Sequence, residues 1–188
     1  MTTEHGDRMI QLQNGRLVHN WRRVEGAKYP RFEAILPAFL QSVSSLTGYL
    51  QEVLKQSVVW NQWEVVYVNV VRKGTVWNSP ADWPGMLPAL FGDVGDAGPG
   101  PWESGSGGWK FVLPDSRGRL HIDFHHGWGQ PAADDDQLVV LQMTARGPVT
   151  EQSVDAIGAG LNLGHDAVVQ TFVRITSERA HQYWGRTT

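Results

Sequence analysis

The chain has 188 residues, of which 41% are hydrophobic and 19% are charged, and its formal net charge is −3. This composition is typical of one globular domain, residues 1–188, and the slightly acidic balance argues against general binding to nucleic acids or anionic membranes. The chain has no cysteine, which excludes disulfides, thiolate metal sites and cysteine nucleophiles and fits a reducing cytoplasm. We expect neither a signal peptide nor a membrane span, because the first residues are polar and no apolar run approaches about 20 residues.

An antiparallel hairpin is predicted near the N-terminus. Asn14 and Gly15 form the pair that best tolerates the positive φ angles of a two-residue type I′ turn. This turn places Ile10 opposite His19. One face of the hairpin is then mostly apolar and carries His19 and Trp21, whereas the other face is mostly polar.

A long amphipathic helix and a strand follow the hairpin. Apolar residues recur at helical spacing from Pro30 to Leu54, and Pro37 within them predicts a kink or a restart. Alternating β-branched residues predict a strand at residues 63–72. Residues 73–108 are rich in Gly and Pro and hold three of the nine tryptophans, so we expect a folded insertion rather than a disordered linker.

The second half of the chain predicts three strands and two helices. The strands, at residues 110–113, 119–128 and 138–146, are separated by turn-forming residues. Thr150 or Ser153 can cap the start of a long helix, and Ser177 caps a short one. The order ββ-α-β-βββ-α-α predicts an α+β fold, a twisted antiparallel sheet with two long helices on one face, similar to a helix-grip arrangement.

Five short motifs stand out along the chain: Gln-Asn-Gly-Arg at residues 13–16, His-Asn-Trp-Arg at 19–22, Tyr-Pro-Arg-Phe-Glu at 29–33, Leu-Gly-His-Asp at 163–166 and Trp-Gly-Arg at 184–186. These motifs resemble a sporadically distributed prokaryotic family of uncharacterised proteins. The resemblance covers about residues 9–186 and implies no activity. Members of that family carry a further strand–helix unit before the hairpin, so we expect the hairpin here to be a sheet edge that a protein partner or a second copy closes.

Two histidines on apolar faces are candidate ligand-binding residues. His19 lies beside Trp21 on the predicted hairpin, and His165 lies on the apolar stripe of the C-terminal long helix. Together with Tyr67 and Asn69 of the third predicted strand, they can line a cavity between sheet and helix that binds a ligand or shuttles a proton. The alternative is a pair of core histidines whose ring nitrogens are satisfied by neighbouring groups.

A basic corner beside aromatic residues is the candidate anion site. Arginines next to aromatic rings can clasp a phosphate or stack on bases, and the alternative is a solvated rim that pairs loosely with nearby acids. The arginines are Arg16, Arg22, Arg23 and Arg31. The tryptophans of the insertion, Trp77, Trp83 and Trp102, are the candidate partner-binding residues.

His121, Asp123 and His125 alternate along one predicted strand and are an alternative as metal ligands, because alternate side chains point to the same face. A closed site needs another ligand from a neighbouring strand, and a solvated sheet face explains the same alternation. We therefore predict no metal and no cofactor. We also predict no catalytic residues, because the chain has no phosphate-binding loop, no Gly-x-Ser-x-Gly nucleophile turn and no His-Glu-x-x-His motif.

These patterns favour a cytoplasmic binding module without catalysis of its own. It would recognise a protein partner or a ligand through the tryptophan-rich insertion and the basic corner. The alternative is a small-molecule-binding protein or an enzyme that uses the cavity lined by His19, Tyr67, Asn69 and His165. A homodimer through the edge of the first hairpin is a third hypothesis, and binding to nucleic acid is not expected.

Overall fold

The chain divides into two compact units in the computed structural model. The first comprises Met1–Asn61 and Thr150–Ala159, and the second comprises Gln62–Val149 and Gly160–Thr188. Among the described residues, no helix is both long enough and apolar enough to cross a membrane. The residues that the structure describes are 6–13, 15–22, 24, 30–91, 98–129 and 136–184.

The first unit begins with the predicted hairpin. Strands β1 (Arg8–Gln13) and β2 (Arg16–Trp21) are antiparallel, and Ile10 lies opposite His19 as the turn chemistry predicts. Gly15 has a φ of 74°, the left-handed value that favours glycine at this point of the turn. Asn14 lies outside the described residues.

The first unit also contains the helix α1 (Phe32–Glu52), which continues through Pro37. Of the two outcomes predicted at this proline, a kink or a restart, the restart is wrong, because the helix is continuous, and the kink stays a prediction. A proline inside a helix removes one backbone hydrogen bond and crowds the carbonyl four residues before it, which can bend a helix without ending it. The segment after α1 is held by Gln152, whose Oε1 atom accepts from the Trp60 amide at 2.8 Å while its Nε2 atom donates to the Trp60 carbonyl at 2.9 Å.

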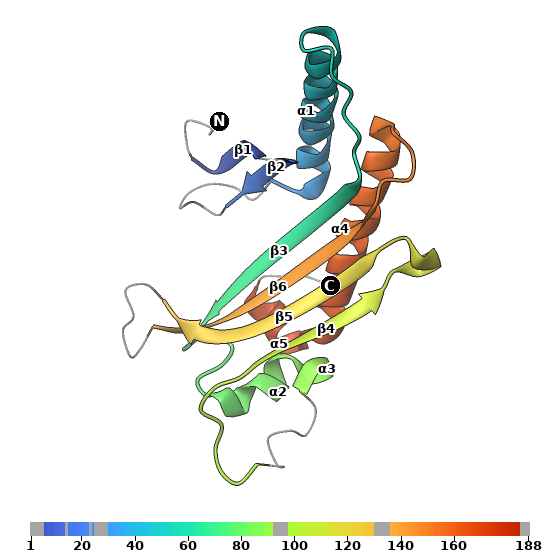
Figure 1. Cartoon of the computed structure of the whole chain (residues 1–188). Coiled ribbons are helices and arrows are strands. Elements are labelled where there is room, and N and C mark those ends of the chain that lie inside the picture. Colours follow the sequence, from blue (N-terminus) through green and yellow to red (C-terminus); the bar gives the residue numbers. More distant parts are fainter. Residues whose placement is uncertain are drawn as a thin grey trace. The chain divides into compact units, whose positions relative to one another are not determined.

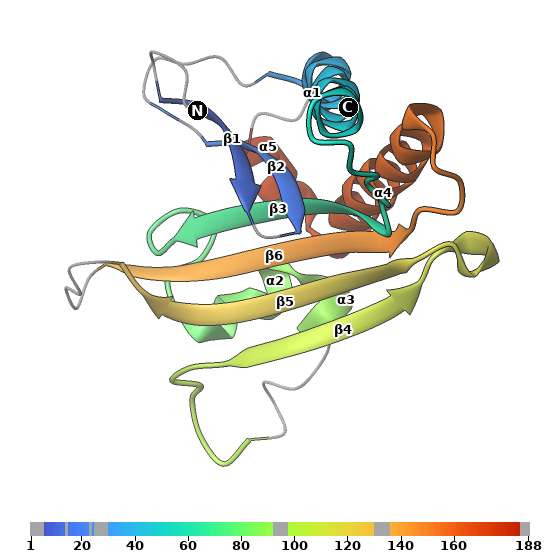
Figure 2. The same ribbon diagram turned by 45° about the horizontal axis from the view of Figure 1, so that its top comes forward.

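The second unit contains a four-stranded antiparallel sheet. Its strands are β3 (Gln62–Arg72), β4 (Ser106–Val112), β5 (Arg119–Trp128) and β6 (Gln137–Pro148). Their order across the sheet is β3-β6-β5-β4 (Figure 1, Figure 2). The predicted α+β class and element order are therefore confirmed. Among the described strands, the hairpin forms a separate two-stranded sheet.

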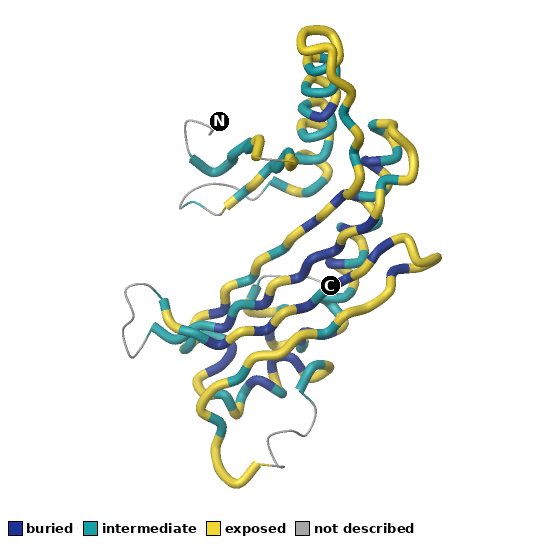
Figure 3. The backbone as a smooth tube through the Cα atoms, viewed as in Figure 1, coloured by how far each residue is buried: buried dark blue, intermediate teal, exposed yellow. Residues whose placement is uncertain are grey.

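Buried and exposed residues alternate along β3 and β5 and in part along β6, so the four-stranded sheet has one buried face and one exposed face (Figure 3). The edge strand β4 is exposed along most of its length. The helices α2 (Trp83–Met86), α3 (Pro88–Phe91) and α5 (Glu178–Tyr183) lie on the buried face (Figure 1). So does α4 (Val154–Ile175) from Gly160 onward. We call this the inner face of the sheet and the opposite one the outer face. The core residues of the inner face are Trp63, Val65, Val71, Leu120, Ile122, Phe124, Val139, Leu141, Met143 and Ala145.

Two glycines let α4 approach the inner face closely. A Cβ atom added at Gly160 would overlap the indole of Trp63, and one added at Gly164 would lie 2.8 Å from Trp63 Cζ3. Trp63 itself is only 4% exposed. The indole thus occupies the space that helix side chains would otherwise fill, which fixes the distance between the helix and β3.

The insertion predicted at residues 73–108 contains the short helix η1 (Pro80–Asp82) together with α2 and α3. Trp77 and Trp83 are fully buried within it. The ring of Trp83 packs edge-on against Phe124 of the sheet, with 5.0 Å between ring centroids. The described part of the insertion is therefore attached to the sheet through aromatic contacts.

Candidate functional site

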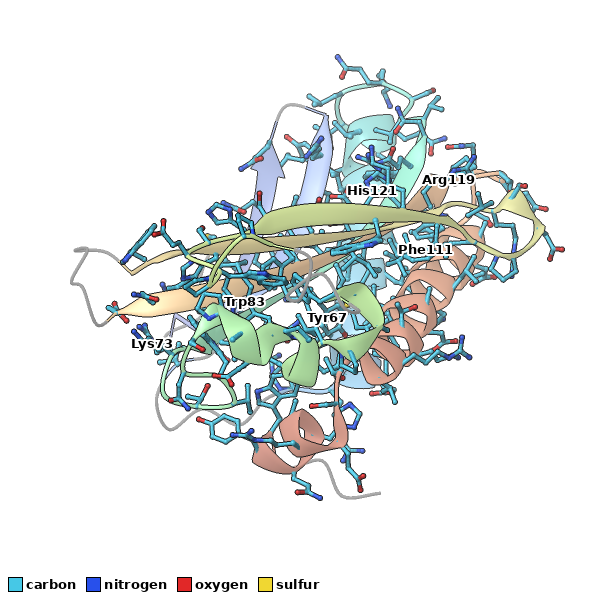
Figure 4. All side chains as sticks on the ribbon, turned by 90° about the horizontal axis from the view of Figure 1, so that it is seen from below. Tyr67, Lys73, Trp83, Phe111, Arg119 and His121 are labelled. Carbon is cyan, nitrogen blue, oxygen red and sulfur yellow. The ribbon has the colours of Figure 1, made fainter. Side chains whose placement is uncertain are left out.

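The outer face of the four-stranded sheet is the candidate functional site. All the helices described for the second unit lie on the inner face (Figure 1). Figure 4 shows Arg119 and His121 on the outer face, and Tyr67 and Trp83 on the helix side of the sheet. Side chains of the outer face are therefore free of the helices of their own unit.

The strand register arranges the outer face in rows that cross the sheet. In an antiparallel sheet, residues directly opposite one another on neighbouring strands project to the same face and touch. From β3 to β4, three consecutive rows are Glu64–Arg146–Arg119–Val112, Val66–Thr144–His121–Lys110 and Val68–Gln142–Asp123–Gly108.

A shallow depression of about 240 Å³ lies among these rows. Thr144 is only 9% exposed although it projects to the outer face. The amide of Gln142 lies 3.4 Å from the Thr144 hydroxyl, so the centre of the depression is polar. Besides Val66, the depression is lined by Glu64, His121, Asp123, Gln142, Thr144 and Arg146.

Positive charges adjoin one another on this face. Arg119 lies directly opposite Arg146, and Lys110 lies opposite His121 in the next row. Like charges directly opposite on neighbouring strands destabilise a sheet. Glu64 compensates only weakly, because its Oε2 atom is 4.0 Å from Arg146 Nη1 and both side chains are substantially exposed. The arrangement therefore favours an incoming negative group.

The setting of His121 lowers the pKa of its imidazole and so favours the uncharged form. Partial burial lowers its pKa from the ordinary 6.5, and the charges of Arg146 and Lys110 lower it further, against the opposing effect of Asp123. A neutral imidazole offers one donor and one acceptor. His121 can thus hydrogen-bond a ligand at neutral pH and gain a positive charge when the pH falls or an anion binds.

The alternative that His121, Asp123 and His125 are metal ligands is not supported. No group of three potential ligands is arranged to hold a metal ion among the described residues. Residues two apart on a strand are separated by about 7 Å and project in parallel, so they do not converge on one ion. The nearby cations Lys110 and Arg146 also repel a metal ion.

Part of the predicted cavity site is brought together on the inner face. The Tyr67 hydroxyl lies 2.9 Å from His165 Nδ1, a hydrogen bond that joins β3 to α4. Asn69, two residues along β3, is half-buried on the same face. Such a pair can orient a polar ligand, and it also ties the helix to the sheet.

His19 and Trp21 lie in the first unit, half-buried on one face of the hairpin. Burial, followed by the charge of Arg8, lowers the pKa of His19. Its Nδ1 atom is buried and has no hydrogen-bond partner in the described part of the chain. A cavity shared with Tyr67 and His165 stays a prediction, because those residues belong to the other unit.

The tryptophans predicted to bind a partner lie in an aromatic cluster. Trp77 and Trp83 each have 0% exposure, and the Trp77 indole donates to the Val71 carbonyl at 3.1 Å. Trp102 is half-buried, with its ring centroid 5.9 Å from that of Trp83. Trp77 and Trp83 therefore stabilise the core and offer no exposed surface to a partner.

The predicted basic corner is spread along the first unit. Arg16 begins β2 and Arg22 follows its other end, so an extended chain separates them by about 20 Å. Arg22 Nε donates to the Gly6 carbonyl at 3.0 Å. Arg31 is exposed just before α1, and Arg23 lies outside the described residues.

Sequence reasoning missed the group formed by Lys110, Arg119 and Arg146. The sequence placed each of these residues within a predicted strand or at the end of one. Only the pairing of β5 with β6, however, places Arg119 opposite Arg146. The connection between those strands has no two-residue turn signature such as Asn-Gly. Its sequence therefore did not specify the register.

No family model, curated protein or solved structure matches the chain. The resemblance inferred from the motifs therefore stays a prediction.

Proposed function

We propose that the protein is a binding module that captures an acidic segment of a protein partner on the outer face of its four-stranded sheet. The observation that carries this proposal is the direct apposition of Arg119 and Arg146. A carboxylate seated between two guanidinium groups accepts charge-assisted hydrogen bonds and removes their mutual repulsion.

The shape of the face supports a protein partner over a small molecule. Small-molecule sites are concave, mostly apolar and usually about 300–1,000 Å³ in volume, whereas the depression measures about 240 Å³ and is lined mainly by polar side chains. Val66, Val68 and Val70 flank it on β3 and are 46%, 56% and 54% exposed. Apolar contacts beside charged ones are typical of a protein interface.

The charges of the face support an acidic peptide over nucleic acid. Glu64 and Asp123 lie among the basic residues and would repel a continuous phosphate backbone. A peptide, in contrast, can place acidic residues opposite the arginines and uncharged residues opposite Glu64 and Asp123. The proposal includes a cytoplasmic location, which the cysteine-free composition supports.

The proposal is tested by titrating ¹⁵N-labelled protein with a decaglutamate peptide, and with a Gly-Ser peptide of equal length as the uncharged control. We expect amide shifts to change along β5 and β6. Arg119→Glu should weaken binding of the acidic peptide about tenfold or more, since it removes a charge-assisted contact and adds repulsion.

The matched control is Arg174→Glu, which makes the same charge change at an exposed position on α4. We expect it to alter the affinity by no more than about twofold. Equal weakening by both substitutions would show attraction to net charge only and would overturn the proposal. Amide chemical-shift changes confined to the arginines of the first hairpin would also overturn the proposal.

A ligand-binding role for Tyr67 and His165 is a second candidate, supported by their hydrogen bond. A screen of small polar ligands by NMR would test it. Shifts at β3 and α4 that disappear in Tyr67→Phe would support this role. A folded Tyr67→Phe variant with unchanged ligand responses would exclude it.

A further inference from the structure

Strand β3 lies at one edge of the four-stranded sheet. Among the described strands, β3 pairs with β6 alone, and Figure 2 shows β3 as the outermost strand on its side of this sheet. Its 11 residues include no proline, glycine or lysine. Natural edge strands often carry proline or lysine, which prevent pairing with another chain. The absence of these residues from β3 leaves its edge suited to pairing.

The sequence of β3 is complementary to itself in an antiparallel arrangement centred on Val68. In that register, Glu64 lies opposite Arg72 of the second copy, and Val66 lies opposite Val70 of the second copy. Each of these pairs occurs twice, and Val68 faces its own counterpart at the centre. On the inner face, Tyr67 lies opposite Asn69 of the second copy. A shift of two residues in either direction would place both charged residues opposite uncharged ones.

We propose that two copies of this chain pair through the edges of their β3 strands in this register, about a two-fold axis at Val68. Two oppositely charged pairs and a row of valines that are 46–56% exposed in the single chain would then meet. Arg72 contacts Asp136 and Glu64 lies near Arg146 within one chain. The side chains of Arg72 and Glu64 are partly exposed, so each can also interact with an oppositely charged side chain of the second copy.

This pairing would join the two sheets into one eight-stranded antiparallel sheet. The two-fold axis runs perpendicular to the sheet, so both outer faces lie on the same side. The inference therefore extends beyond capture of one acidic segment, and it rests on the sequence and position of β3 rather than on the arginines of β5 and β6.

Cysteine cross-linking tests the register directly, because the natural chain has no cysteine. We expect Val68→Cys to form a disulfide-linked dimer under mild oxidation, since directly opposite residues in an antiparallel pair have Cα atoms about 4.5–5.5 Å apart, within disulfide reach. Val66→Cys alone and Val70→Cys alone should stay uncrosslinked, because each lies about 13 Å along the strand from its own counterpart. An equal mixture of those two variants should cross-link.

Charge reversal supplies an independent test. Glu64→Arg and Arg72→Glu each place like charges opposite one another, so each variant alone should dimerise at least about tenfold more weakly. Mixed together, the two variants present opposite charges at every such pair, and we expect the dimer to return in sedimentation analysis. Recovery on mixing shows that both variants are folded.

Three outcomes would overturn the pairing. The first is equal cross-linking of the Val66→Cys and Val68→Cys variants, which indicates random collision. The second is a natural chain that is monomeric at about 100 μM, above the dissociation constants of most specific complexes. The third is a dimer insensitive to both charge reversals, which assigns association to another surface such as the first hairpin. None of these outcomes bears on the acidic-peptide titration.

Discussion

At the scale of single residues, we expect His121 to make anion binding at the outer face depend on pH. The pKa of His121 is held below 6.5 by burial, Arg146 and Lys110. An anion bound beside it stabilises the imidazolium form and therefore raises that pKa. Binding of an anion must then be accompanied by proton uptake, and affinity must increase as the pH falls through the pKa of the complex.

We expect the affinity for the decaglutamate peptide to rise between about pH 8 and pH 6, a range well above the ordinary glutamate pKa of about 4.3, so the peptide stays ionised. His121→Gln keeps a polar side chain and should remove this rise while leaving the affinity at pH 8 within about twofold. Fluorescence anisotropy at several pH values measures both quantities. An unchanged pH profile in the variant would exclude His121 from the site.

At the scale of elements, the insertion depends on a cap at the start of η1. Asp82 Oδ2 accepts from the Asn78 and Ser79 amides at 2.8 and 2.9 Å. These backbone hydrogen bonds are the main cause of its lowered pKa. Burial opposes them, and the charge of Arg179 has a weaker lowering effect than that opposition. A carboxyl whose pKa is lowered by folding stabilises the folded state only while it is ionised.

We expect Asp82→Ala to lower the free energy of unfolding at pH 7 by about 0.5–1 kcal/mol, the usual contribution of an exposed helix cap. The contribution is complete above the ordinary value of 3.8 and disappears as the pH falls through the lowered pKa. The variant and the natural chain should therefore converge in urea unfolding once the pH falls below that lowered pKa. Glu103→Ala, at an exposed carboxylate in the same insertion, should change little at either pH.

The elements with strong local chemistry could be predicted from the sequence. Gly15 and the alternation around Ile10 and His19 specified the first hairpin, and the apolar stripe that includes His165 specified α4. The buried positions of Trp77 and Trp83 could not be predicted in this way. Their burial results from packing of α2 against Phe124 of a distant strand, and local composition does not encode that contact.

At the scale of the whole molecule, local and net charge act in opposite directions on an acidic partner. The chain carries a formal net charge of −3, whereas the outer face presents Lys110, Arg119 and Arg146. Charges are felt over about 30 Å at 0.01 M salt but only about 10 Å at 0.1 M. Under the proposed function, the net charge should therefore oppose binding chiefly at low salt, and the outer face should attract the peptide at short range.

We expect the affinity for the decaglutamate peptide to change little between about 0.01 and 0.1 M salt and to fall steeply between about 0.1 and 0.5 M. Over the first interval, screening of the net charge offsets screening of the arginines. Isothermal titration across this series measures the profile. A steep fall beginning at the lowest salt would indicate that the net charge has no part in recognition.

The outer face itself marks the limit of sequence reasoning for the whole molecule. The alternation of His121, Asp123 and His125 correctly indicated a solvated face. The charge of this face depends, however, on which residues of β5 and β6 lie opposite one another. A shift of two residues in the β5–β6 register would separate Arg119 from Arg146 while keeping the same alternation. Only the assembled sheet shows which charges adjoin one another.

The two glycines that pack against Trp63 also affect the local unfolding of the second unit. Gly160 and Gly164 each favour helix less than alanine by about 1 kcal/mol, so this stretch of α4 has little helical preference of its own. This stretch of α4 therefore depends for its helical conformation on packing against the indole of Trp63 in β3. Helix and strand should therefore exchange their amide hydrogens with solvent in one cooperative opening, as a single unit of local stability.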